Sequence, residues 1–155
     1  MNVIRGLAIV VICLGIVGLL TGSAFAGMGF YRNNQLIEAM QEEQVTLGIE
    51  GEELGGEVID SLGEAQTAGD TIREHRRGIA PTYSDLLGGG QYNPEDPEQL
   101  SYAQALNLEN YLYLAVVAFG LTQSVMASGA FMVVTGIAII VTGVVLYRLR
   151  QKIPW

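Results

Sequence analysis

Two long stretches of the chain contain no charged residue, and a polar region separates them. The first stretch runs from Gly6 to Tyr31 and the second from Asn110 to Tyr147. At about 1.5 Å of rise per residue, a helix over either stretch is long enough to cross the roughly 30 Å hydrocarbon core of a bilayer. The pattern predicts an all-α membrane protein with two transmembrane helices and a mostly helical domain between them.

The second stretch is too long for one simple crossing, so two interpretations arise. One is a hairpin of two short spans that turns near Ser128 and Gly129, which gives three crossings in all. The other is a single helix that crosses the bilayer with its last twenty or so residues. Between Met126 and Phe131 there is no proline, asparagine or charge. A turn into the polar interface is therefore disfavoured, and we expect one helix.

Small residues recur every seven positions in both apolar stretches, which places them on one side of a helix. These helix-packing candidates are Ala8, Gly15, Gly22 and Gly29 in the first stretch, and Ala115, Thr122, Gly129, Gly136 and Gly143 in the second. Small side chains let membrane helices approach closely. The two sets predict a close-packed, left-handed helix pair, or the same surfaces used between subunits.

Charge is sharply partitioned along the chain. All sixteen acidic residues lie between Glu38 and Glu109, whereas the two ends carry only basic side chains. By the positive-inside tendency, both termini face the cytoplasm and the acidic middle faces out. The predicted segments are a cytoplasmic N-terminus (1–5), a first transmembrane helix (6–31), an acidic extracytoplasmic helical domain (32–110), a long apolar helix including the second span (111–147) and a basic cytoplasmic tail (148–155).

The first stretch also fits a second interpretation. A basic start, an apolar run and the triplet from Ala24 to Ala26 resemble a secretory signal with its cleavage site. The apolar run continues beyond Ala26 to Phe30, which is long for a signal core. We expect an uncleaved signal anchor, with cleavage after Ala26 as the alternative.

The polar region shows helical patterns of its own. The first helix is expected to run on through 35–44, and an amphipathic helix is expected from Glu57 to Arg77, ended by Gly78. A short ordered segment at 81–87 and a flexible glycine triplet at 88–90 follow. Asp96 is a predicted N-cap, with Gln99 completing a capping box.

Beyond that cap, one long helix would carry apolar side chains outside the membrane. They are Leu100, Leu108, Tyr111 and Leu114. These side chains need cover, which we expect partly from the helix at 57–77 and partly from another subunit.

One basic cluster stands out in a region, 32–110, whose net charge is −12. Its candidate partner-contact residues are Arg73, His75, Arg76 and Arg77. The arginines either pair with nearby carboxylates or contact an anionic partner, with His75 adding pH sensitivity. The acidic run from Glu38 to Glu64 matches no EF-hand loop, and such runs are usually solvated.

Four stretches carry a resemblance to a known group. They are Glu43–Leu47, Ala65–His75, Pro81–Leu86 and Asn110–Gly120. In these stretches and in its layout the chain resembles small bacterial membrane proteins usually described as aromatic ring-opening dioxygenase, LigA-type. The resemblance implies a multi-pass protein of the bacterial plasma membrane. A glycine-rich insert at 88–97 departs from the group.

The chemistry implied by that description is not expected here. Extradiol ring cleavage needs a non-haem iron held by two histidines and a carboxylate, and His75 is the only histidine. We expect no enzyme activity, no cofactor and no metal, and the acidic surface excludes nucleic acid.

The predicted function is a structural or accessory subunit of a membrane assembly that packs through its small-residue faces. Its partners would be the lipid bilayer and copies of itself or a larger complex. The alternative is an extracytoplasmic acidic module that binds a cation or a basic partner.

Overall fold

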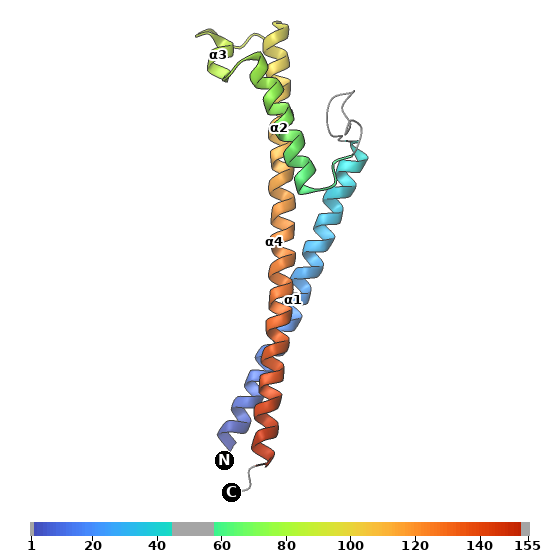
Figure 1. Ribbon diagram of the computed structural model, residues 1–155, viewed down its shortest axis with the longest axis vertical. Helices are drawn as coiled ribbons and strands as arrows, with labels where there is room; N and C mark the ends of the chain where they lie inside the picture. The colour runs from blue at the N-terminus through green and yellow to red at the C-terminus, as the bar shows by residue number, and fades with distance from the viewer. Residues whose placement is uncertain (1, 45–57, 153–155) are drawn as a thin grey trace. The chain divides into compact units, whose positions relative to one another are not determined.

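Helices make up most of the chain. The computed structural model describes residues 2–44 and 58–152, and these residues form four helices (Figure 1). The helices are α1 (Asn2–Glu42), α2 (Leu62–Ile79), α3 (Tyr83–Leu87) and α4 (Pro97–Lys152). Both α1 and α4 are long and apolar enough to cross a membrane. The coarse prediction of an all-α chain with two such helices is confirmed.

Helix α4 runs unbroken for 56 residues, straight through Ser128 and Gly129. The hairpin interpretation is therefore wrong, because nothing in that segment breaks the helix. The predicted start is confirmed, since a carboxylate oxygen of Asp96 accepts the N–H of Glu98 at 2.9 Å. The capping box is altered, because the side chain of Gln99 accepts the N–H of Asn93 rather than that of Asp96.

Helix α1 continues past the first apolar stretch to Glu42, which confirms its predicted extension. In the most apolar 18-residue windows of α1 and α4, only 11% and 17% of the residues are buried within the chain. A core helix of a water-soluble protein would be mostly buried. The low burial is consistent with insertion of both helices in a membrane.

Helix α2 starts and ends at different residues from those predicted. The expected start at Glu57 lies outside the described residues, and 58–60 are not helical. Ser61 caps the helix because its hydroxyl accepts the N–H of Glu64 at 3.3 Å. The expected stop at Gly78 is wrong. The helix passes through Gly78 to Ile79 and ends because Pro81 holds the preceding Ala80 in an extended conformation.

Helix α3 forms one short turn of structure in the segment expected to be ordered. The hydroxyl of Thr82 caps its start by accepting the N–H of Asp85 at 3.2 Å. Gly88 ends it with φ of 54°, a left-handed conformation that glycine adopts at low cost.

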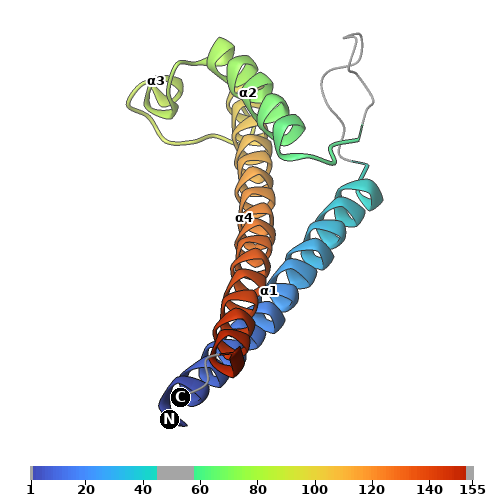
Figure 2. The ribbon, with the colours of Figure 1, turned by 60° about the horizontal axis from the view of Figure 1, so that its bottom comes forward.

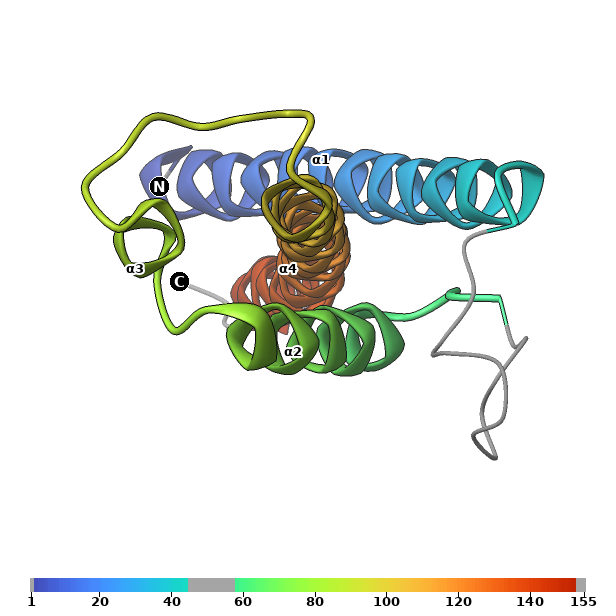
Figure 3. The ribbon, with the colours of Figure 1, turned by 90° about the horizontal axis from the view of Figure 1, so that it is seen from above.

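The chain divides into two compact units. The first comprises Met1–Asn33 and Thr122–Trp155, and the second is Asn34–Leu121. In the first unit, α1 and α4 run antiparallel (Figure 2). In the second unit, α2 packs along one side of α4 (Figure 3). The buried core of the second unit is Ile59, Ala65, Ala68, Leu112, Ala115 and Phe119.

Candidate interaction surface

The predicted small residues of the first unit lie between α1 and α4. Those buried there are Ala8, Gly15, Gly22, Gly29, Gly129, Gly136 and Gly143. A Cβ atom added to Gly22 would lie 2.7 Å from the carbonyl oxygen of Gly129 and 2.7 Å from the amide nitrogen of Val133. The two backbones are therefore too close at this point for any side chain to fit between them.

The same close approach recurs along the pair. A Cβ atom on Gly136 would lie 2.8 Å from the carbonyl oxygen of Gly15, and one on Gly143 would lie 3.2 Å from that of Ala8. At the other end, Thr122 donates a hydrogen bond to the side-chain oxygen of Asn33 at 3.1 Å. Ala115, the remaining candidate, is buried in the core of the second unit. These small-residue faces are thus occupied within the chain.

Large apolar side chains of the first unit point outward instead. Leu20 is 65% exposed and Phe131 is 72% exposed. Small residues inside and large apolar residues outside reverse the arrangement of a protein that folds in water. In a bilayer this arrangement is favourable, because lipid tails solvate the outer face and small residues let the helices pack closely.

A buried ion pair joins α2 to α4 in the second unit. The Nε atom of Arg76 donates to Oε2 of Glu109 at 2.6 Å, and its Nη1 atom donates to the hydroxyl of Tyr102. The guanidinium also lies 4.9 Å from the centre of the Tyr102 ring. The hydrogen-bonded carboxylate of Glu109 raises the pKa of Arg76. Arg76 therefore holds two helices together and is not available to a partner.

A second polar cluster, more exposed to water, lies along the same two helices. The hydroxyl of Tyr113 donates to Oδ1 of Asp70 at 2.6 Å, and Gln66 donates to Oδ2 at 3.0 Å. These hydrogen bonds, that from Tyr113 first, lower the pKa of the Asp70 carboxyl. Arg73 forms an ion pair with the same carboxylate at 2.6 Å. Two of the three arginines in the basic cluster thus pair with carboxylates.

His75 and Arg77 are exposed on α2. A ring nitrogen of His75 lies 3.3 Å from the carbonyl oxygen of Thr71 on the same helix. The hollow beside His75 is lined by α2 alone, so it brings no second element to a ligand. Of the four candidate contact residues, these two remain accessible.

Sequence reasoning missed Tyr102, Glu109 and Tyr113 as members of these clusters. Glu109 lies 33 positions from Arg76, so no helical spacing connects them. The available signal was that Glu109 is an isolated carboxylate at the start of a charge-free stretch. An isolated carboxylate beside apolar residues needs a cationic partner when it is buried.

One side of α4 in the second unit is uncovered by the residues that the structure describes. Tyr111, Leu114, Val117 and Leu121 follow one another at intervals of three or four residues and are 62–65% exposed. The buried core residues of α4 lie on the other side of the helix, against α2 and the end of α1. We call the uncovered side the outer face of α4. Helix α2 covers the helix only from one side, so the expected need for further cover remains.

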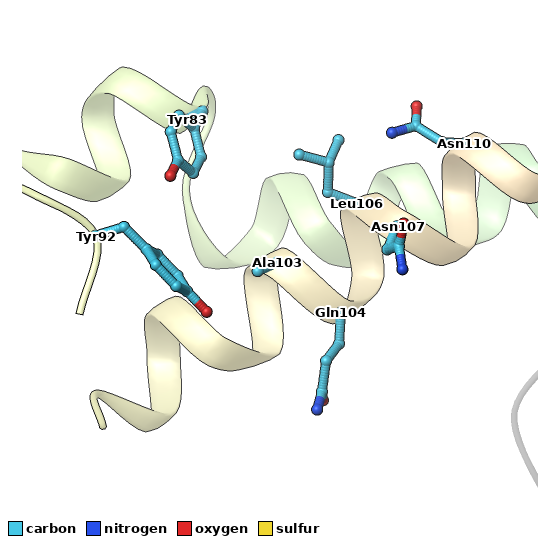
Figure 4. A pocket seen from close by; sticks show the side chains of 7 residues that line it. All are labelled: Tyr83, Tyr92, Ala103, Gln104, Leu106, Asn107 and Asn110. Carbon is cyan, nitrogen blue, oxygen red and sulfur yellow. The ribbon is translucent and has the colours of Figure 1, made fainter. Parts of the chain in front are cut away.

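A hollow of about 440 Å³ adjoins the N-terminal part of this face (Figure 4). Tyr83 of α3 and Tyr92 of the following loop border it on one side. Residues of α4, including Asn107 and Asn110, form its floor. The lining carries no charge, so the hollow suits a neutral contact rather than an ion.

The acidic residues give no metal site within the described part of the chain. No group of three or more histidine, cysteine, aspartate or glutamate residues is placed to hold a metal ion there. Glu50, Glu52, Glu53 and Glu57 lie outside the described residues. The alternative of an acidic binding module therefore stays a prediction.

No protein-family model, curated protein or solved structure matches this chain. The resemblance to the LigA-type group stays a prediction.

Proposed function

We propose that the protein is a structural or accessory subunit of a membrane assembly, which contacts its partner through the outer face of α4. One observation carries the proposal: in the second unit, Tyr111, Leu114, Val117 and Leu121 are about two-thirds exposed, while the opposite side of the helix is packed. Contiguous exposed apolar surface of this kind marks interaction sites in folded proteins. We place the chain in the bacterial plasma membrane as a two-span protein.

Both termini are placed in the cytoplasm, with the region 32–110 outside. The basic residues at the two ends support this orientation through the positive-inside tendency. The guanidinium of Arg5, near the start of α1, lies 5.5 Å from the ring centre of Tyr147, near the end of α4. The two basic ends thus meet at one end of the first unit, as two cytoplasmic ends of a helix pair would.

The bilayer is too thin to cover the whole of the outer face. About 54 Å of helix separates Tyr147 from Tyr111, at about 1.5 Å per residue. A bilayer with its headgroups is only about 40–45 Å thick, so Tyr111 and Leu114 emerge from the membrane even with a typical tilt of about 20°. Water is a poor solvent for these side chains, and we infer that protein covers them.

The rest of the second unit is built to hold that face in place. The Arg76–Glu109 pair and the Asp70–Tyr113 hydrogen bond connect α2 to α4. The small-residue faces are occupied between α1 and α4, which leaves the outer face as the exposed apolar side of α4 that the second unit offers to a partner. A rigid surface loses little conformational entropy when it binds.

Purification in mild detergent followed by native mass spectrometry tests the proposal. The wild-type chain should appear in a complex larger than one copy. Leu114→Glu should release the single chain, because burying an unpaired carboxylate at the contact is costly. Thr67→Glu adds the same charge at an exposed position of α2 and should leave the complex intact. A wild-type chain that runs alone under all conditions would overturn the proposal.

A further inference from the structure

We propose that the partner on the outer face of α4 is a second copy of this chain, paired in parallel so that the two Asn107 side chains meet. This inference rests on the proposed function and names its partner. It starts from the spacing of the exposed residues. Leu100, Asn107, Leu114 and Leu121 are seven positions apart, and all four are exposed.

Seven-residue spacing is the pattern by which two helices pack along their length. Residues three positions further on complete the seam of such a pair, and here they are Ala103, Asn110 and Val117. Leu114, Val117 and Leu121 form its apolar half, whereas the half near α3 carries amides. A face with this spacing fits another helix better than an irregular surface.

The charge of the face selects a neutral partner. Between Gln99 and Leu121 the only charged residue of α4 is Glu109, which is buried against Arg76. The surrounding region, 32–110, has a net charge of −12, so two copies would repel one another over most other surfaces. On the outer face of α4, this acidic region can meet its own copy without bringing like charges together.

The membrane sets the direction of the pair. Copies inserted with the same orientation have their α4 helices running the same way, with a twofold axis along the membrane normal. In a symmetric parallel pair, each residue on the seam faces its own counterpart. Asn107 would therefore face Asn107, and an amide can both donate to and accept from an identical amide. Among Leu100, Asn107, Leu114 and Leu121 only position 107 is polar, and one asparagine in such a set specifies register and oligomer state.

The structure leaves room for this contact. The hollow bordered by Tyr83 and Tyr92 opens beside Asn107 on the outer face (Figure 4). Tyr83 is 44% exposed and Tyr92 is 36% exposed, so both rings are available to an incoming helix. Tyrosine supplies large contact area at low entropic cost, and its hydroxyl tolerates a polar neighbour.

Cysteine cross-linking in native membranes tests the pairing. In a chain with Cys13→Ala, Leu114→Cys lies on the proposed seam, whereas Leu108→Cys lies on the same helix away from it. A disulfide requires Cα atoms within about 7 Å, so only the first should give a covalent dimer, on the order of tenfold more than the second. Equal cross-linking at both positions, or none at position 114, overturns the pairing.

A charge placed at the centre of the seam gives a second test of the pairing. Asn107→Asp would set two carboxylates against each other and should lower cross-linking through Leu114→Cys on the order of tenfold. Thr67→Asp adds the same charge on α2 and should not. An unchanged dimer yield with Asn107→Asp would show that the two Asn107 side chains do not meet.

The outcomes separate this inference from the proposed function. If Leu114→Cys cross-links to a different protein and never to itself, the second copy is ruled out while the accessory role stands. If the wild-type chain is single in native mass spectrometry and Leu114→Cys forms no cross-link, both are overturned. A dimer of twice the chain mass, cross-linked at position 114 and not at 108, supports both.

Discussion

Replacing Gly22 by alanine should weaken the contact between α1 and α4 in the first unit. The added Cβ atom would lie 2.7 Å from two backbone atoms of α4, whereas ordinary van der Waals contact begins at 3.4 Å. Backbone atoms cannot rotate away as a flexible side chain can. The helices must therefore separate by about 0.7 Å around this point, or the pair must shift.

The cost follows from two effects. Overpacking of a closely packed interface typically costs about 1–3 kcal/mol. A gap of about 0.5–1 Å also removes roughly a quarter to a half of the dispersion energy of the neighbouring contacts. Alanine favours the helix over glycine by up to about 1 kcal/mol, which offsets part of the loss.

Gly27→Ala is the matched control. Gly27 lies five positions along the same helix, and an added Cβ atom there meets nothing within 4 Å. Its gain in helix propensity should equal that of Gly22→Ala, so the difference between the two variants isolates the clash. We expect Gly22→Ala to be less stable than Gly27→Ala by about 1–3 kcal/mol.

The assay follows separation of the two helices as SDS is titrated into a mild-detergent solution. Pyrene labels on the native Cys13 and on Val141→Cys, both exposed positions of the first unit, report proximity through excimer fluorescence. The midpoint should fall for Gly22→Ala and stay or rise for Gly27→Ala. Equal midpoints for the two variants would refute the close backbone contact.

Three further predictions concern the second unit. Arg76→Ala leaves Glu109 buried without its cation and should cost about 3–5 kcal/mol in thermal unfolding, whereas the exposed Arg77→Ala should cost little. The pKa of Asp70 is lowered below 3.8 in the folded chain, so its stabilisation is present above pH 3.8 and is lost as pH falls through the folded-state value. Asp70→Asn should remove that part of the acid sensitivity, and an unchanged acid profile would contradict it. Gly88→Ala should destabilise α3 by about 1–2 kcal/mol, because φ of 54° strains alanine.

Much of the architecture was already determined by local sequence. No proline and no charge interrupts the stretch from Asn110 to Tyr147, and α4 runs through it as one helix. The Asp96 cap needs only neighbouring residues, since its carboxylate accepts N–H groups two and three positions away. Such features depend on short-range sterics and hydrogen bonding, which the order of residues already contains.

The end of α2 shows where local rules compete. Gly78 predicted a stop, but glycine only weakens a helix, whereas the proline at 81 forbids its continuation through Ala80. Small residues recur every seven positions in each of the two long helices, with Gly22 in one set and Gly129 in the other. This spacing likewise indicated contact surfaces without saying which surfaces meet. The folded chain places the glycines of α1 against those of α4.

Only the tertiary structure decided which polar and apolar groups are free. Arg76 and Arg77 are neighbours in sequence, yet one is buried with Glu109 and the other is exposed. Leu112 and Leu114 lie two positions apart on α4, and only Leu114 is left uncovered, because α2 packs on one side of the helix. Burial depends on which distant segments arrive at a surface, and spacing along one helix carries no record of that.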